Sequence, residues 1–238
     1  MIKEKAFTLA EVLIVLAIIG VVAAMTIPTM VANYQKQQYV TQLKKVYTEL
    51  SQALKQMLVD QGVDKVSATD ILTKQDSEDD NTAMQRAGNE FLKKYFKIAK
   101  ECGLEAQSSC FAPEYSQIAD SASSMSINVP YAVITSSGAS IVVRPSTEAM
   151  AGSFVVDING PNKPNIQGRD LFLMSFYYDG SIDSVTPECR KGLPTTNSPV
   201  CAGYADAFEN RETRFSDSGP SYGVSFGKII NDNWKMDY

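Results

Sequence analysis

The sequence contains no histidine among its 238 residues, and this absence removes several kinds of chemistry. Serine–histidine–aspartate and cysteine–histidine catalysis both need an imidazole, and so do histidine-ligated metal centres. The acids show no paired spacing typical of an acid/base site. Ordinary values of 44% hydrophobic and 21% charged residues exclude a disordered chain, a collagen-like repeat and a multi-span membrane protein.

Positive charge is also scarce. The net charge of −5 disfavours a protein that binds nucleic acid by neutralising phosphates. Residues 1–58 hold six lysines and three acids, a net of +3, whereas the remaining residues carry a net of −8. The distribution predicts an acidic soluble body behind a mildly basic, apolar N-terminal segment.

That N-terminal segment is unusually apolar. Residues 7–33 contain one charge, Glu11, and a helix over residues 10–32 would be roughly 35 Å long, enough to cross a bilayer of about 30 Å. Three interpretations compete: a cleaved secretory signal, an ordinary membrane anchor, and a membrane segment in which Glu11 has a function.

The residues KAFTLAEVLIVLAIIG, from Lys5 to Gly20, resemble the prepilin motif of type IV pilins and type II secretion pseudopilins. The resemblance implies a leader over residues 1–6, a cut between Ala6 and Phe7 by a prepilin peptidase, and N-methylation of Phe7. Ala6 stands where the family usually has glycine. In this family the acid corresponding to Glu11 follows the cut at a fixed distance.

Glu11 gains a physical role from this arrangement. Cleavage creates an amino terminus at Phe7, and in a helical assembly Glu11 of one subunit meets the terminal amine of its neighbour. A buried carboxylate is tolerable when paired and costly when unpaired, so Glu11 would set the subunit register. Pro28 either ends the membrane span or bends the helix. Because apolar residues continue at steps of three and four beyond it, we predict one kinked helix from about Thr8 to Leu58, with residues 7–32 transmembrane.

Residues 59–238 are predicted to form the head domain. Residues 60–81 are polar and predict a solvated loop, residues 83–102 show helical spacing, and residues 116–126 predict another loop. Five short runs favour strands. Residues 129–135 and 139–144 are expected to form one hairpin, residues 171–178 and 181–185 a second, and residues 153–158 a single strand. The expected fold class is α+β, an antiparallel sheet laid on the C-terminal half of the long helix, as in pilins. The apolar residues of 223–238 predict a partly ordered tail.

Four cysteines occur as two local pairs, Cys102 with Cys110 and Cys189 with Cys201. Three disulfide connectivities are possible, and we predict the two local ones because each closes a loop within one irregular segment. Structural zinc favours closer spacing, and reduced thiols are the remaining alternative.

A segment rich in Asp, Asn and Gly runs from Asp157 to Asp170. Its side-chain oxygens predict a calcium site, chiefly through Asp157, Asn159 and Asp170, with Asn162 and Asn165 nearby. The alternative is a structural turn in which Gly and Asn supply unusual backbone angles. The segment also resembles one in pseudopilin-like heads, some of which bind calcium.

Together these features predict a non-enzymatic structural subunit of a pilus-like or secretion filament. It would be stored as a single-pass inner-membrane protein with its head extracytoplasmic. It would then polymerise with itself or with other pilin-like subunits through an assembly platform in the inner membrane. The alternatives are a subunit of a DNA-uptake pilus, which would need a basic or aromatic surface, and an anchored hydrolase. No nucleic-acid partner is expected.

Overall fold

The computed structural model describes residues 8–103, 109–118, 124–145, 150–184 and 207–238. The chain divides into two compact units, Met1–Gln38 and Tyr39–Tyr238. The second unit, here called the head, begins at Tyr39 rather than at the predicted residue 59, because the C-terminal part of the long helix supplies its core. The predicted leader, residues 1–6, lies outside the described residues.

Helix α1 spans Leu9–Gln61 and continues past Pro28. Its part within the head buries a stripe at steps of three and four, which confirms the predicted helical periodicity: Val40, Leu43, Val46, Leu50, Ala53, Leu54 and Met57. Each fully buried leucine contributes roughly 1.5–3 kcal/mol relative to exposure, so this stripe attaches α1 firmly to the rest of the head.

The region after α1 is more ordered than the polar composition predicted. A 3₁₀ turn covers Val66–Ala68, and Val66, Ile71 and Leu72 are buried, so the prediction of a solvated loop over residues 60–81 is wrong in its middle. Arg86 fixes this stretch by pairing with Glu78 at 2.6 Å and donating to the carbonyls of Ile71 and Thr73.

The helix predicted over residues 83–102 is three short pieces followed by a strand. Helix α2 spans Asp80–Ala87, a π-helical turn η2 spans Gly88–Leu92, and α3 spans Lys93–Tyr95. Asp79 caps α2 by accepting hydrogen bonds from the N–H groups of Asn81 and Thr82. Glycine is required at position 88, because a Cβ there would overlap the Tyr131 ring. The last five residues form strand β1, which pairs with β4.

One sheet of nine strands lies in the described part of the chain, in the order β1-β4-β5-β6-β8-β7-β2-β3, with β9 paired to β8. All pairs are antiparallel except β2 with β7 and β7 with β8. The strands are β1 Ile98–Cys102, β2 Tyr115–Gln117, β3 Ser124–Met125, β4 Ala132–Thr135, β5 Ser140–Pro145, β6 Met150–Asp157, β7 Ile166–Gln167, β8 Leu171–Tyr177 and β9 Ile182–Asp183. Both predicted hairpins are present, as β4–β5 and β8–β9. The predicted loop over residues 116–126 contains most of β2 and all of β3.

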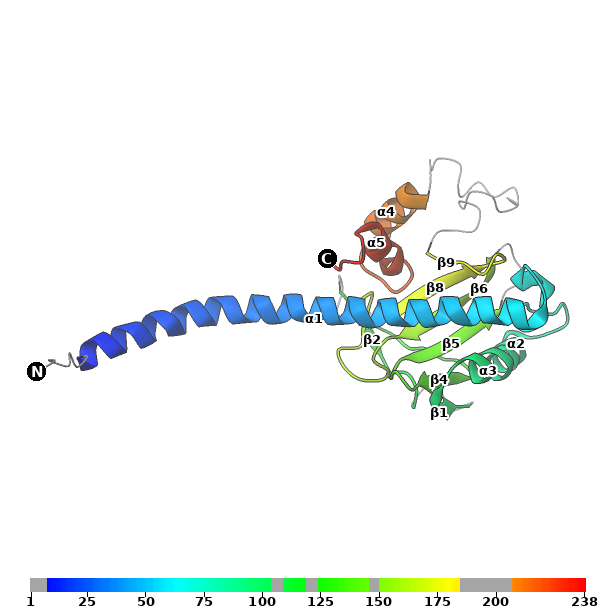
Figure 1. Ribbon diagram of the computed structural model, residues 1–238, viewed down its shortest axis with the longest axis horizontal. Coiled ribbons are helices and arrows are strands. Elements are labelled where there is room, and N and C mark those ends of the chain that lie inside the picture. The colour runs from blue at the N-terminus through cyan, green and yellow to red at the C-terminus, as the bar shows by residue number, and fades with distance from the viewer. Residues whose placement is uncertain (1–7, 104–108, 119–123, 146–149, 185–206) are drawn as a thin grey trace, which may run out of the picture. The chain divides into compact units, whose positions relative to one another are not determined.

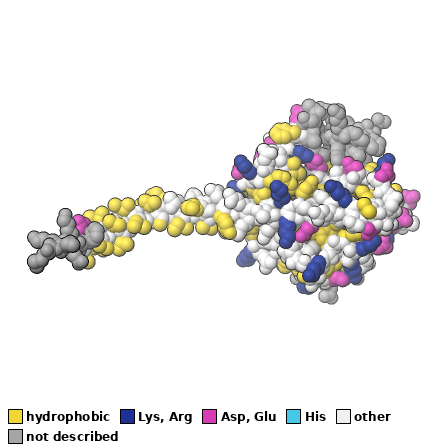
Figure 2. Space-filling view, viewed as in Figure 1, with side chains coloured by type: hydrophobic (Ala, Val, Ile, Leu, Met, Phe, Trp, Pro, Cys, Tyr) yellow, Lys and Arg dark blue, Asp and Glu magenta, His cyan; other side chains and the backbone are white. Residues whose placement is uncertain are grey.

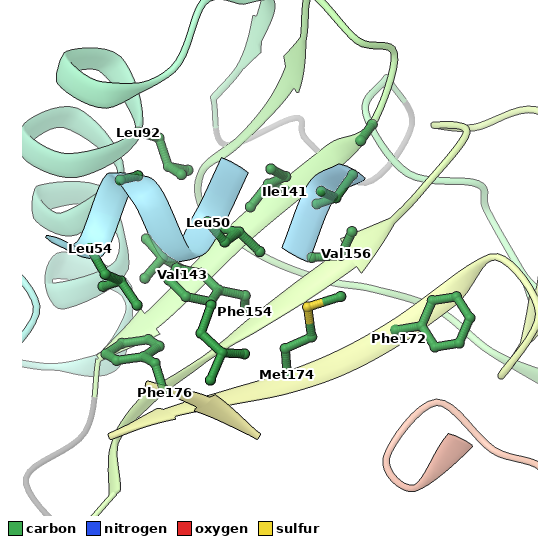
Figure 3. Packing of buried hydrophobic residues seen from close by; sticks show 14 of the residues in the cluster. Leu50, Leu54, Leu92, Ile141, Val143, Phe154, Val156, Phe172, Met174 and Phe176 are labelled. Atoms are coloured by element: carbon green, nitrogen blue, oxygen red, sulfur yellow. The ribbon is translucent and has the colours of Figure 1, made fainter. Parts of the chain in front are cut away.

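The central strands are buried on both faces. On one face, side chains of β5, β6 and β8 point toward α1 and form the larger core (Figure 3), which includes Ile141, Val143, Phe154, Val156, Phe172, Met174 and Phe176. The alternate residues Val142, Val155 and Leu171 enter a smaller core on the opposite face. Within the head, the C-terminal part of α1 lies across these strands (Figure 1), so the predicted α+β arrangement is confirmed.

The C-terminal region adds two helices, α4 (Ala207–Ser218) and α5 (Ser225–Asn231). Val224, Phe226 and Ile229 are buried, and Trp234 lies against Tyr47 of α1, which confirms the predicted order of the tail. The sequence did not predict α4. Arg211 joins it to the sheet through a salt bridge of 2.6 Å to Asp183 of β9.

The local disulfide between Cys102 and Cys110 is present, as predicted. It ties the end of β1 to the smaller core, where Cys102, Cys110 and Phe111 are buried. The second predicted pair, Cys189 and Cys201, lies outside the described residues.

Candidate functional site

The first unit presents an apolar surface on all sides of α1. Fourteen large hydrophobic side chains from Leu9 to Val31 are between 46% and 80% exposed, and Figure 2 shows yellow side chains along this part of the helix. Of the described helices, α1 is long and apolar enough to cross a membrane. A helix that is apolar on all sides needs lipid or other apolar helices around it, whereas a helix of a soluble head needs one apolar stripe.

Glu11 lies at the beginning of this surface and helps to cap the N-terminus of α1. Its carboxylate accepts hydrogen bonds from the Thr8 backbone N–H (2.9 Å) and the Thr8 hydroxyl (2.8 Å). The Thr8 hydroxyl accepts in return from the Glu11 N–H at 3.3 Å. This is a capping box, which the Thr-x-x-Glu spacing signals in the sequence and which sequence reasoning missed. In the single chain, therefore, the Glu11 carboxylate is hydrogen bonded by its own helix terminus.

Of the other assembly residues predicted from sequence, Pro28 lies within α1, between Ile27 and Thr29 on the exposed apolar surface. The cleavage residues Ala6 and Phe7 lie outside the described residues. The processing of Ala6 and Phe7 and the assembly roles of Glu11 and Pro28 remain predictions.

The segment from Asp157 to Asp170 joins β6 to β8 and holds two fully buried carboxylates. Asp170 accepts hydrogen bonds from the N–H groups of Asn165 (2.6 Å) and Ile166 (2.7 Å). Asp157 accepts from the Tyr115 hydroxyl at 2.5 Å and from the Asn159 N–H at 3.2 Å. Sequence reasoning missed Tyr115, because it lies 42 residues before Asp157 and no local pattern connects the two.

The asparagines of this segment mainly brace its own backbone. The Asn159 amide donates to the carbonyls of Asn162 and Lys163, both at 3.1 Å, and the Asn162 amide donates to the Asn159 carbonyl at 2.7 Å. Asn165, Gly160 and Gly168 have positive φ values of 56°, 69° and 76°. These contacts are those of the structural turn that the sequence analysis kept as its alternative.

Burial changes the protonation of both acids. It raises the pKa of the Asp157 carboxyl well above its usual range, and the nearby Asp170 charge adds to the rise. Burial also raises the pKa of Asp170 to about 6, against the opposing effect of the hydrogen bonds from Ile166 and Asn165. In the described part of the chain, Asp157 and Asp170 have no third acid or cysteine beside them to form a metal cluster.

The donors nevertheless suit a hard cation. The side-chain oxygens of Asn159 and Asn165 are buried and accept no hydrogen bond. Together with the carboxylates of Asp157 and Asp170 they give an all-oxygen set, which is the chemistry that calcium prefers. Calcium binding by Asp157, Asn159 and Asp170 thus stays a prediction.

In EDTA, the stability of the head is expected to decrease as the pH rises from about 4 to 7. A carboxyl whose pKa rises on folding favours the folded state fully at a pH below its pKa in the unfolded chain, about 3.9. This stabilisation is lost as the pH rises through the pKa in the folded state, which is about 6 for Asp170. The shift corresponds to a loss on the order of 2–3 kcal/mol. Urea unfolding at several pH values measures it. Asp170→Asn should flatten the dependence, and equal slopes in both proteins would contradict the assignment.

Calcium at millimolar concentration is expected to raise the thermal midpoint of the head at pH 8, where both carboxyls are more fully ionised. A ligand that binds the folded state alone stabilises it by mass action. Thermal unfolding in calcium, in magnesium and in EDTA measures the effect, and Asp157→Asn should abolish it. Identical midpoints in calcium and EDTA would end the calcium prediction.

The pentapeptide Gly219–Gly223 (GPSYG) matches G-x-S-x-G, the motif around the nucleophilic serine of many hydrolases. The sequence analysis missed this match. In such hydrolases the serine lies on a turn between a strand and a helix, whereas Ser221 lies between helices α4 and α5. The chain also has no histidine to act as the base. Here the Ser221 carbonyl accepts hydrogen bonds from the N–H groups of Val224 (3.4 Å) and Ser225 (3.1 Å). The pentapeptide therefore forms the turn that leads into α5.

Comparison with known families agrees with this architecture. The prokaryotic N-terminal methylation motif matches residues 1–27. With the apolar helix and the α+β head, this motif defines a protein of the type IV pilin-like class. The chain belongs to the Family of unknown function (DUF6613), whose model matches residues 29–210. The comparisons found no match among curated proteins or solved structures.

Proposed function

We propose that this chain is a structural, non-enzymatic subunit of a type IV pilus-like or type II secretion pseudopilus filament. The observation that carries the proposal is the continuity of the N-terminal methylation motif with a helix whose apolar side chains are exposed on all sides. Such a helix suits lipid before assembly and a bundle of like helices afterwards. The head would then form the outer surface of the filament.

Processing prepares the helix for assembly. A prepilin peptidase hydrolyses the peptide bond between Ala6 and Phe7, and the free α-amino group of Phe7 is then methylated. The new amine lies next to Thr8, whose N–H and hydroxyl already bind Glu11. On assembly, the Glu11 carboxylate accepts a hydrogen bond from the terminal amine of a neighbouring subunit. This bond either replaces those from Thr8 or is added to them. An unpaired carboxylate in an apolar bundle is severely destabilising, so this pairing favours one register.

The same features support a proposed location. The apolar helix anchors the unassembled chain in the cytoplasmic membrane, and the head lies outside the cytoplasm, where the disulfide between Cys102 and Cys110 is stable. The partners are other pilin-like subunits, the prepilin peptidase and the assembly platform in the membrane. The net charge of −8 beyond residue 58 opposes phosphate binding, so nucleic acid is not proposed as a partner.

Mass spectrometry of the native protein is expected to find an N-terminal peptide beginning at methylated Phe7. Ala6→Gly, which restores the residue usual in the family, should give the same product, whereas a bulky residue at position 6 should leave the leader attached. A mature chain that begins at Met1, or after Ala24, would refute the proposed processing.

A further inference from the structure

Strand β2 contacts both halves of the segment that carries the two buried carboxylates. The Tyr115 hydroxyl, at the start of β2, donates to the Asp157 carboxylate at 2.5 Å. The backbone N–H of Ser116, the next residue, donates to the Asn165 carbonyl at 3.1 Å. The Asn165 N–H in turn donates to Asp170. Strand β2 therefore links the two acids that the sequence predicts as calcium ligands.

The Tyr115 side chain is fixed in one orientation. It is fully buried, and its hydroxyl oxygen accepts a hydrogen bond from the Ala112 N–H at 3.0 Å. The hydroxyl hydrogen is then directed to one oxygen of the Asp157 carboxylate. The Asn159 N–H donates to the other oxygen at 3.2 Å. The orientation of the Asp157 carboxylate is thus set by the protein itself.

The chain immediately before β2 is anchored by the disulfide between Cys102 and Cys110. Cys110 and Ala112 are fully buried in the smaller core, and the Ser140 hydroxyl donates to the Cys110 carbonyl. Ser140 lies opposite Asp157 in the pairing of β5 with β6. The disulfide therefore ties the end of β1 to a buried segment that lies directly beside Asp157.

Strand β2 needs such an anchor because its pairing within the sheet is short. It has three residues, and each of its neighbours, β3 and β7, has two. Together β2 and β3 form one end of the strand order. Short strands with few backbone hydrogen bonds open locally at a low cost in free energy. Loss of the disulfide should therefore release β2 while the central strands remain folded.

The predicted calcium ligands depend on this arrangement. Residues that hydrogen bond to a metal ligand orient it, and their loss typically weakens metal affinity by about 10–100-fold. Tyr115 has this relation to Asp157, and Ser116 has it indirectly to Asp170 through Asn165. The disulfide acts one step further away, because it holds the segment from which Tyr115 projects.

Resting on the proposed function and on the predicted calcium site, we propose that Tyr115 is the positioning residue of that site, and that the site is complete only when Cys102 and Cys110 are joined. Formation of the bond takes two electrons and two protons from the two thiols, and a disulfide-bearing oxidant outside the cytoplasm accepts them. Calcium then binds exported, oxidised heads in preference to reduced chains.

Calorimetric titration of the full chain in detergent with calcium chloride at pH 8 tests the role of Tyr115. Tyr115→Phe keeps the buried ring and removes the hydroxyl, so it should weaken calcium affinity about 10–100-fold. Tyr131→Phe is the matched control, because its hydroxyl also donates to a carboxylate, Glu101 at 3.3 Å, but its ring packs in the larger core. The control should bind calcium as the wild type does. Equal affinities for Tyr115→Phe and the wild type would overturn the proposal.

Replacing both Cys102 and Cys110 by alanine should weaken calcium affinity in the same way, and hydrogen exchange in EDTA identifies the cause. The Ser116 N–H should exchange several-fold faster than in the oxidised head, whereas the N–H groups of Phe154 and Val155, paired on both sides in β6, should stay protected. Unchanged exchange at Ser116 would contradict the anchoring. Loss of protection in β6 as well would show a general role in stability and would also overturn the proposal.

These measurements are independent of filament formation. A wild-type head that binds no calcium would overturn the present proposal and leave the proposed function intact. A chain that is not processed before Phe7 and never enters a filament would overturn the proposed function, whatever the calcium affinities of these variants.

Discussion

Glu11→Ala is expected to abolish filament assembly while membrane insertion continues. The substitution removes the one charged side chain between Thr8 and Lys36, so insertion into lipid becomes easier. It also leaves the neighbouring amine without a carboxylate in an apolar bundle, where an unpaired charge costs several kcal/mol. Membrane fractionation and electron microscopy of sheared filaments measure the two effects separately.

The capping box makes this experiment sharper, because different variants separate the observed cap from the proposed charge pairing of Glu11. Glu11→Gln keeps the capping geometry, since glutamine serves at this position of a capping box, but it removes the charge. Thr8→Ala keeps the charge and removes the side-chain half of the cap, at a cost of about 0.5–2 kcal/mol in helix stability. If the charge sets the register, Glu11→Gln should fail to assemble and Thr8→Ala should still form filaments. Normal filaments from Glu11→Gln would refute the pairing.

Phe154→Ala is expected to destabilise the head by about 3–5 kcal/mol, the usual cost of such a cavity. Phe154 is fully buried, and its ring lies between those of Phe91 (centroids 5.9 Å apart) and Phe176 (4.6 Å). Since domains have about 5–15 kcal/mol of stability in total, much of the head would unfold near physiological temperature. Urea unfolding of the full chain in detergent measures the loss.

Two further variants control for size and position. Phe154→Leu retains most of the apolar volume and should cost far less than the alanine variant. Val59→Ala, at an exposed position near the end of α1, should change stability by less than about 0.5 kcal/mol. Processing at Phe7 should continue in all three proteins, because the motif and the head core belong to different units. An alanine variant at position 154 with wild-type stability would contradict the packing of the core.

The predictions from sequence succeeded where a local pattern carries the physics. The apolar run and the fixed spacing of Phe7 and Glu11 identified the class of protein. The stripe from Val40 to Met57 placed the second half of α1 against a sheet, because one helical face must be buried. Alternating residues around Phe154 and the Asp179-Gly180 turn located strands and a hairpin.

The predictions failed where distant contacts outweigh local preference. Ile98–Cys102 continues a helical spacing, yet it forms β1 because it completes the sheet beside β4. The loop over residues 60–81 looked solvated, but Arg86 ties it to the head and buries Ile71 and Leu72. The polar composition of α4 concealed a helix that is held by Asp183.

The single acid at a fixed place in a long apolar run was enough, by itself, to identify the type IV pilin-like class, and the absence of histidine added the prediction of a non-enzymatic subunit. These features are local and are read directly from the order of residues. Only the tertiary structure brought Tyr115 to Asp157 and Arg211 to Asp183. Such arrangements depend on contacts between residues that are far apart in the chain, and no spacing within a short segment encodes them.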